Sequence, residues 1–442
     1  MDPTLHTRRK FLRTSMLGAA ASWTLPVFLE KTFFTLDAMA AEAVTQAATG
    51  KDGTILVVLQ MAGGNDGLNM VVPFGDDAYY RSRPRLGIPA GQILKVDSYA
   101  GLNPKLTGLK SLFDEGHLSI IQGVGYPNPN RSHFRSTEIW QTASDADRNE
   151  SEGWLGKYFD SCCAGADPTV GVAIGDQMPQ AFVARALTGV TFSKPEQFRW
   201  MPSEKRTGPM SAEETFFRQL NGGNDEDTAP AANTGGSIGA IAGGTKVNKS
   251  AVDFLQRTAL DAQLSSDKIL AIARKYKSNM PYPKGQLAAS LSLIARMIAG
   301  GLPTRVYYAS QGGFDTHAGQ LNTHDRLMTE LNGSLSAFVA DLKEQGNFDH
   351  VLLMTFSEFG RRVGDNANGG TDHGAAAPMF VLGGAVKPGL YGKCTSLTDL
   401  DHGDLKFNTD FRSVYGTILD RWLRAPSELV LGHKFSSLPI IG

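Results

Sequence analysis

Cysteine is scarce in this chain of 442 residues, which contains three cysteines and no Cys-x-x-Cys pair. This scarcity excludes cysteine-based zinc fingers and small domains that depend on several disulfides. One disulfide stays open as an alternative, because Cys394 could pair with Cys162 or Cys163 in an oxidising compartment.

An excess of charge of one sign is also lacking. The 43 Lys and Arg residues nearly balance the 44 Asp and Glu residues, which leaves a formal net charge of −1. The composition therefore gives no sign of a basic surface for a polyanion, and we expect no nucleic-acid partner. A hydrophobic content of 41% and a charged content of 20% are those of an ordinary globular protein.

The N-terminus lacks an apolar run long enough to span a bilayer comfortably. Arg8 and Arg9 precede an uncharged run at 14–29 that is rich in Ala and Gly, and Ala-Met-Ala follows at 38–40. This order predicts a twin-arginine signal peptide over 1–40, removed after export by the twin-arginine translocation machinery. We expect a periplasmic or secreted protein with no stable membrane anchor after cleavage. A basic amphipathic first helix is the alternative.

Short apolar runs alternate with helical patterns along the rest of the chain. The predicted strands cover 54–59, 118–122, 170–174, 305–309, 351–356 and 379–382, and the clearest helices cover 286–299, 320–343 and 410–423. Strands that are apolar throughout and separated by helices predict an α/β fold, with a doubly wound, mostly parallel sheet covered by helices on both faces. We expect 41–442 to form a single domain with a flexible, Gly-rich insertion at about 221–246.

Polar residues follow several of these strands directly, usually after glycine. In an open α/β sheet, the carboxyl ends of the strands are where ligands bind. The residues at these ends are Asp66, Asp315, His317, Glu358, Arg361, Asp372 and His373. Carboxylates and imidazoles together suit Zn²⁺, Mn²⁺ or a similar ion, so we predict that Asp66, Asp315, His317, Glu358, Asp372 and His373 bind a metal.

Each of these motifs also has a simpler interpretation when it is taken alone. Asp66 is suited to capping a helix, Asp315 to forming an Asx-turn, and Asp372 with His373 to a surface loop. The metal prediction rests on their occurring together at successive strand ends.

A second kind of candidate lies in "YPNPNRSHFRSTEIWQTA" at 126–143. Ser132 stands where a helix can begin, with Arg131 and Arg135 close by in sequence. The positive end of a helix dipole favours an anionic substrate and a partly ionised hydroxyl, which would make Ser132 a nucleophile. The alternative is that Ser132 only caps the helix.

These motifs together resemble the large bacterial exported family called domain of unknown function 1501. The resemblance covers about 50–440 and rests on "GGNDGLNMVVPFGDDAYYRSRP", "RSHFRSTEIWQTA", "GGFDTHAGQ", "TFSEFGRRVGDN" and "GGTDHGAAAPMFVLGG". That family is similar in fold to the alkaline phosphatase and sulfatase superfamily. The resemblance implies a bimetal site at strand ends, with a Ser, Thr or modified Cys nucleophile at a helix N-terminus.

The order of the motifs agrees with that implication, since Asp66, Ser132, Asp315 with His317, and Asp372 with His373 follow one another as the superfamily places its ligands and nucleophile. The spacing departs from it. One residue separates Asp315 from His317 where the superfamily usually has three, and His402 and His433 are the only downstream candidates for a final ligand. A one-metal site, or a site that binds without turnover, therefore stays open.

The function predicted from the sequence is an exported, metal-dependent hydrolase of phosphate or sulfate esters, with phosphate preferred. The cofactor would be a divalent metal (Zn, Mn, Mg or Ca) and the partner a small anionic ester. Ser132 and Arg135 would be catalytic, while Arg131 and Arg361 would bind the anion. The alternative is a non-catalytic binding or assembly protein on a phosphatase-like scaffold.

Overall fold

The computed structural model describes residues 53–164, 166–185, 189–196 and 265–442. The chain divides into two compact units. The first comprises Ala43–Ser193 and Ala271–Gly442, and the fold below is that of this unit. The second comprises Met1–Glu42 and Lys194–Leu270, of which 194–196 and 265–270 are described. The predicted signal peptide and the predicted insertion at 221–246 lie outside the described residues.

A nine-stranded sheet in the described residues forms the centre of the first unit, in the order β11-β5-β10-β9-β1-β8-β6-β7 with β14 beside β5. These strands are β1 Ile55–Met61, β5 Leu118–Gly125, β6 Gly171–Ile174, β7 Val190–Phe192, β8 Val306–Gln311, β9 Val351–Phe356, β10 Ala377–Gly383, β11 Gly389–Tyr391 and β14 Thr409–Asp410. Strand β10 is antiparallel to β9 and β5, and the other neighbours in the sheet run parallel.

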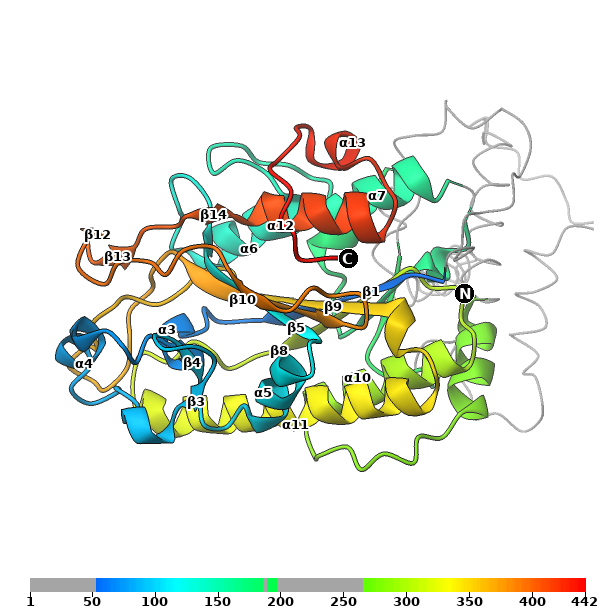
Figure 1. The fold of residues 1–442 in the computed structure, drawn as a ribbon. Helices are drawn as coiled ribbons and strands as arrows, with labels where there is room; N and C mark the ends of the chain where they lie inside the picture. Colours follow the sequence, from blue (N-terminus) through cyan, green and yellow to red (C-terminus); the bar gives the residue numbers. More distant parts are fainter. Residues whose placement is uncertain (1–52, 165, 186–188, 197–264) are drawn as a thin grey trace, which may run out of the picture. The chain divides into compact units, whose positions relative to one another are not determined.

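Helices cover both faces of this sheet (Figure 1). One face carries α6 His133–Thr142, α7 Trp154–Cys162, α12 Phe411–Thr417 and α13 Ser427–Leu431, and the other carries α5 Thr107–Asp114, α10 Gln286–Ala299 and α11 Gln320–Glu344. The α6 face packs through stacked rings, since Trp140 lies 4.4 Å from Phe411 and Trp154 lies 4.3 Å from Tyr415 between centroids. The predicted α/β class, with a mostly parallel sheet covered on both faces, is confirmed.

Several shorter helices and strands accompany the central sheet and its main helices. They are α3 Gly67–Met70, β2 Val71–Val72, α4 Asp77–Ser82, β3 Leu94–Lys95, β4 Gly101–Leu102, β12 Leu400–Asp401 and β13 Asp404–Leu405, with short helical turns η2 Ala90–Gln92, η3 Pro168–Val170, η4 Gln180–Phe182 and η5 Phe348–His350. Among the helices of the described part, none is both long enough and apolar enough to cross a bilayer.

All six strands expected from the sequence are present, with ends that differ by up to three residues. The last predicted helix is different, because α12 passes into a π-helical turn, η6 Ile418–Trp422. Trp422 donates its indole N–H to the carbonyl of Ile55, 2.9 Å away, so contact with β1 accompanies the wider turn. The three cysteines are free thiols, and the disulfide alternative is therefore wrong for this structure.

Candidate metal centre

Three neighbouring parallel strands deliver the candidate site to one edge of the sheet. Strands β9, β1 and β8 lie side by side, so their carboxyl ends meet. Strand β8 leads to Asp315 and His317, β9 leads to Glu358, and the loop before β10 carries His373. Helix α6, which follows β5, adds His133 as its first residue.

The turn after β1 requires glycine for this approach. Gly63 has φ +121°, and a Cβ atom there would lie 2.4 Å from the backbone nitrogen of Asp315. Gly64 has φ +76°, and its Cβ would lie 2.3 Å from the ring of Phe359. The sequence Gly-Gly after the first strand therefore lets the β1 and β8 loops touch.

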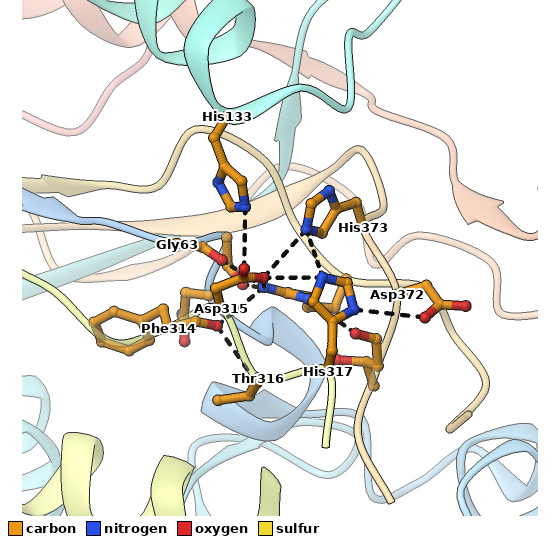
Figure 2. A network of polar contacts seen from close by, with 12 residues as sticks. Gly63, His133, Phe314, Asp315, Thr316, His317, Asp372 and His373 are labelled. Carbon is orange, nitrogen blue, oxygen red and sulfur yellow. Dashed lines mark hydrogen bonds and ion pairs between the residues drawn. The ribbon is translucent and has the colours of Figure 1, made fainter. Parts of the chain in front are cut away.

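Three imidazoles converge on the Asp315 carboxylate (Figure 2). The Nε2 atoms of His317 and His373 lie 2.8 Å apart, and they are 3.0 and 3.2 Å from Asp315 Oδ1. His133 Nε2 lies 3.4 Å from Asp315 Oδ2. Donor atoms of His133, Asp315 and His373 all fall within 4.8 Å of one another, which is the spacing of ligands around one ion.

The opposite nitrogen of each ring faces an acceptor. His373 Nδ1 lies 2.8 Å from the carbonyl oxygen of Arg131, so it must carry the proton. His133 Nδ1 lies 2.8 Å from Glu358 Oε1, and His317 Nδ1 lies 3.6 Å from Asp372 Oδ1. An acceptor behind Nδ1 turns the Nε2 lone pair of a neutral imidazole toward a metal.

His133 gives the most direct indication that an ion fits beside the Nε2 atoms. Its Nε2 atom is buried and has no hydrogen-bond partner among the described residues. Asp315 Oδ2 at 3.4 Å is near this nitrogen but makes no hydrogen bond with it. A buried nitrogen without a hydrogen bond is costly, and an ion beside it removes that cost. The donor set of three imidazoles and one carboxylate fits a transition metal.

Asp315 stays ionised at neutral pH. Burial acts to raise its pKa, but the hydrogen bond from Arg361, the contact with His373 and the nearby positive charge outweigh burial and hold the pKa at about 2. Arg361 donates to Asp315 Oδ1 over 2.7 Å. The pKa of Asp372 is lowered as well, first by a hydrogen bond from Asn366 and then by His317.

Arg361 connects the loops of the site through hydrogen bonds. Its buried guanidinium donates to the carbonyls of Gly63, Gly64, Phe314 and Thr371 as well as to Asp315. Because these contacts engage the N–H donors of Arg361 with acceptors of the protein, the structure does not favour its predicted role in binding an anion.

Asp66 lies outside the imidazole cluster. Its carboxylate is 1% exposed, pairs with Arg83 over 2.6 Å and accepts a hydrogen bond from Gln320. Burial alone would raise its pKa, but the charge and hydrogen bond of Arg83 lower it. The structure thus gives Asp66 a guanidinium partner where the sequence predicts a metal.

Ser132 and the preceding Arg131 make different contacts. Ser132 is the N-cap residue of α6, yet its hydroxyl makes no capping hydrogen bond. Arg131 pairs with Asp404, which also lies 3.4 Å from Arg362.

Arg135 points to the loop after α6. It donates to the carbonyls of Asp145 and Ala146 and pairs with Glu138 over 2.8 Å. Arg135 is thus held by the protein, and this geometry does not favour its predicted catalytic role.

His133 is the ligand candidate that the sequence analysis missed. It stands next to Ser132 in the "RSHFR" motif, in which the predicted functional group is the serine hydroxyl. The available signal was an imidazole at the start of a helix that follows an apolar strand. Glu358, also predicted to bind metal, lies behind His133 and accepts the backbone N–H of Gly63 over 2.8 Å.

The model of one protein family, described as "Protein of unknown function (DUF1501)", matches residues 120–420. The chain belongs to this family. The matched region contains every residue of the imidazole cluster. No curated protein matches the chain.

Several solved structures are similar to this member of the DUF1501 family. The C-terminal periplasmic domain of EcEptC from Escherichia coli, in complex with Zn, is 10% identical, with 76% of this chain and 74% of that chain covered and a TM-score of 0.35. The sulfatase PsFucS1 from Pseudoalteromonas sp. is 11% identical, with 87% and 70% covered and a TM-score of 0.37. A protein in the alkaline phosphatase superfamily from Vibrio parahaemolyticus is 10% identical, with 79% and 65% covered and a TM-score of 0.32.

Proposed function

We propose that His133, His317, His373 and Asp315 bind a divalent transition metal, and that the protein is an exported, metal-dependent hydrolase of phosphate or sulfate esters. The observation that carries the proposal is the convergence of three Nε2 atoms on one carboxylate, with an acceptor behind each ring. Imidazole nitrogens select Zn²⁺ or Mn²⁺ over Mg²⁺ and Ca²⁺.

The ion would supply Lewis-acid polarisation of an ester oxygen. Glu358 and the Arg131 carbonyl would hold His133 and His373 in the tautomers that leave Nε2 free. Asp315 would supply the negative charge that balances the ion. Arg361 would hold the loop that carries Asp315 against the loop after β1 and the loop before β10. Ser132, beside His133 at the start of α6, remains the proposed nucleophile.

A non-catalytic binding protein is the second candidate, and one observation favours it. The guanidinium groups of Arg131, Arg135 and Arg361 are all engaged by carboxylates or carbonyls of the protein. A site that holds a metal without free cations for the ester has less means of stabilising charge in a transition state.

Metal analysis and turnover together test the proposal. The purified full chain should contain close to one equivalent of Zn or Mn and hydrolyse an aryl phosphate or aryl sulfate. The double variant Asp372→Asn with His373→Gln should lose most of the metal while its circular dichroism stays unchanged. A wild-type protein that takes up no transition metal would overturn the proposal.

Ser132→Ala separates two levels of the mechanism. Loss of turnover by orders of magnitude, with the metal retained, supports a serine nucleophile. Full turnover with the metal retained would show that a water molecule attacks instead, and that Ser132 was assigned wrongly. Metal without any turnover in the wild-type protein favours the binding protein.

A further inference from the structure

A cavity of about 550 Å³ lies at the carboxyl ends of β1, β8 and β6, apart from the residues of the metal centre. Its walls include the side chains of Gln60, Gln141, Gln180, Gln286, Tyr308 and Ser310. This volume is in the range of sites that hold a small organic molecule.

Three of these side chains lie on one face of the sheet. Gln60 and Ser310 are direct partners in the β1–β8 register, and Tyr308 lies two residues before Ser310 on the same face. Gln141 from α6 covers them. It donates to the Tyr308 hydroxyl over 3.1 Å, and Tyr308 donates to Gln60 Oε1 over 2.6 Å. Burial raises the pKa of Tyr308, so its hydroxyl remains a donor.

This network leaves hydrogen-bonding groups unused. Gln60 Nε2 and the side-chain amide of Gln286 have no hydrogen-bond partner among the described residues. Amides offer both a donor and an acceptor, which matches the two roles of a hydroxyl group. An apolar ligand would leave these groups unpaired, at a cost in affinity.

Charge is nearly absent from the walls. Among the described residues, the lining contains no Lys, Arg or His, and its one carboxylate, Asp176, is exposed. A phosphate or sulfate group would find no cation among these residues. Ile174, Met178 and Pro179 add apolar surface suited to the C–H face of a ring. We propose that this cavity binds a neutral, polyhydroxylated ligand, a sugar unit.

The elements that line the cavity also carry the metal centre. Gln141 follows His133 by eight residues in α6, a distance of about 12 Å along a helix. Gln60 lies three residues before Gly63 in the β1 segment, and Ser310 lies five before Asp315 in the β8 segment. If the proposed hydrolysis holds, on which this step rests, the sugar unit is the alcohol part of the ester.

Binding of neutral sugars to the full chain tests the cavity without any reaction. The probes are glucose, galactose, mannose, fucose, N-acetylglucosamine and lactose, followed by saturation-transfer NMR and calorimetry. At least one should bind with a millimolar or lower Kd. Gln286→Ala changes an exposed position on the wall. Because this variant loses about one net hydrogen bond to the sugar, that Kd should rise by roughly fivefold or more. The matched control Gln92→Ala, exposed and outside the cavity, should leave it unchanged.

Two results would overturn the inference. Either no sugar of the panel binds, or binding is the same in Gln286→Ala and in Gln141→Met, which removes an amide from the floor at nearly constant volume. The measurements are repeated on protein treated with a chelator. Sugar binding without metal uptake or turnover would overturn the proposed function and support the cavity assignment. Turnover without sugar binding would support the proposed function and overturn the cavity assignment.

Discussion

At the residue scale, the site depends on how closely two loops approach. Gly63 has a backbone conformation that side chains rarely adopt, and the space for a Cβ is taken by the backbone of Asp315. A methyl group there must push the Asp315 loop away, and with it the carboxylate that the three imidazoles share.

We expect Gly63→Ala to lower the free energy of unfolding by about 2 to 4 kcal/mol. The matched control is Gly369→Ala, which has φ +67° but nothing within 4 Å of the new Cβ. It should cost about 1 kcal/mol, from the left-handed conformation alone. Urea unfolding of both variants measures the difference, and equal losses would show that the loop contact is unimportant.

At the scale of elements, sequence periodicity predicted the long helices well. The boundaries of α10 agree with the prediction at 286–299, because apolar residues recur with helical spacing along all of its length. Periodicity over one turn cannot separate an α-helical from a π-helical turn, which is why η6 was missed. The edge strands β7 and β11 were missed too, since three residues carry no period.

Helix α11 carries a titratable group that its amphipathic pattern does not reveal. His324 is fully buried, and its Nε2 atom donates to Asn65 Oδ1 over 3.0 Å. Burial lowers the pKa of His324 below its ordinary value of 6.5, although the Asp66 charge acts in the opposite direction. The unfolded chain therefore takes up a proton at this position at a higher pH than the folded protein does.

It follows that the folded state loses stability as the pH falls below 6.5 toward the native pKa, by up to about 1.4 kcal/mol per pH unit. His324→Gln keeps a donor for Asn65 and should remove this component of the pH dependence. Urea unfolding of both proteins at pH 8, 7, 6 and 5, with a chelator present, measures it. Parallel curves for the two proteins would contradict the prediction.

At the scale of the whole molecule, the candidate site joins segments that are far apart in the sequence. Glycine-flanked Asp and His residues after apolar strands were sufficient to predict that Asp315, His317 and His373 meet. The sequence could not predict that Arg83 would neutralise Asp66, because this pairing depends on the packing of α4 and its C-terminal end against the β1 loop. For the same reason, the engagement of Arg361 by four carbonyls could not be read from "TFSEFGRRVGDN".

A bound ion would hold these segments together and should stabilise the entire fold. Free Zn²⁺ at about a thousand times its Kd contributes roughly 4 kcal/mol to the free energy of unfolding. We therefore expect the thermal midpoint of chelator-treated protein to rise by several degrees when Zn²⁺ is restored. The Asp372→Asn, His373→Gln variant is the control and should show no rise. An equal rise in both proteins would place the ion elsewhere.

The short separation of His317 and His373 has a consequence for how the site would fill. Two Nε2 atoms at 2.8 Å need one hydrogen between them, and His373 already commits its own to the Arg131 carbonyl through Nδ1. His317 must then supply it. An ion that ligates both nitrogens requires this hydrogen to leave Nε2, so His317 would carry its hydrogen on Nδ1, 3.6 Å from Asp372 Oδ1. The empty and the loaded site would therefore differ in the tautomer of His317, and Asp372 would be the acceptor that stabilises the loaded form.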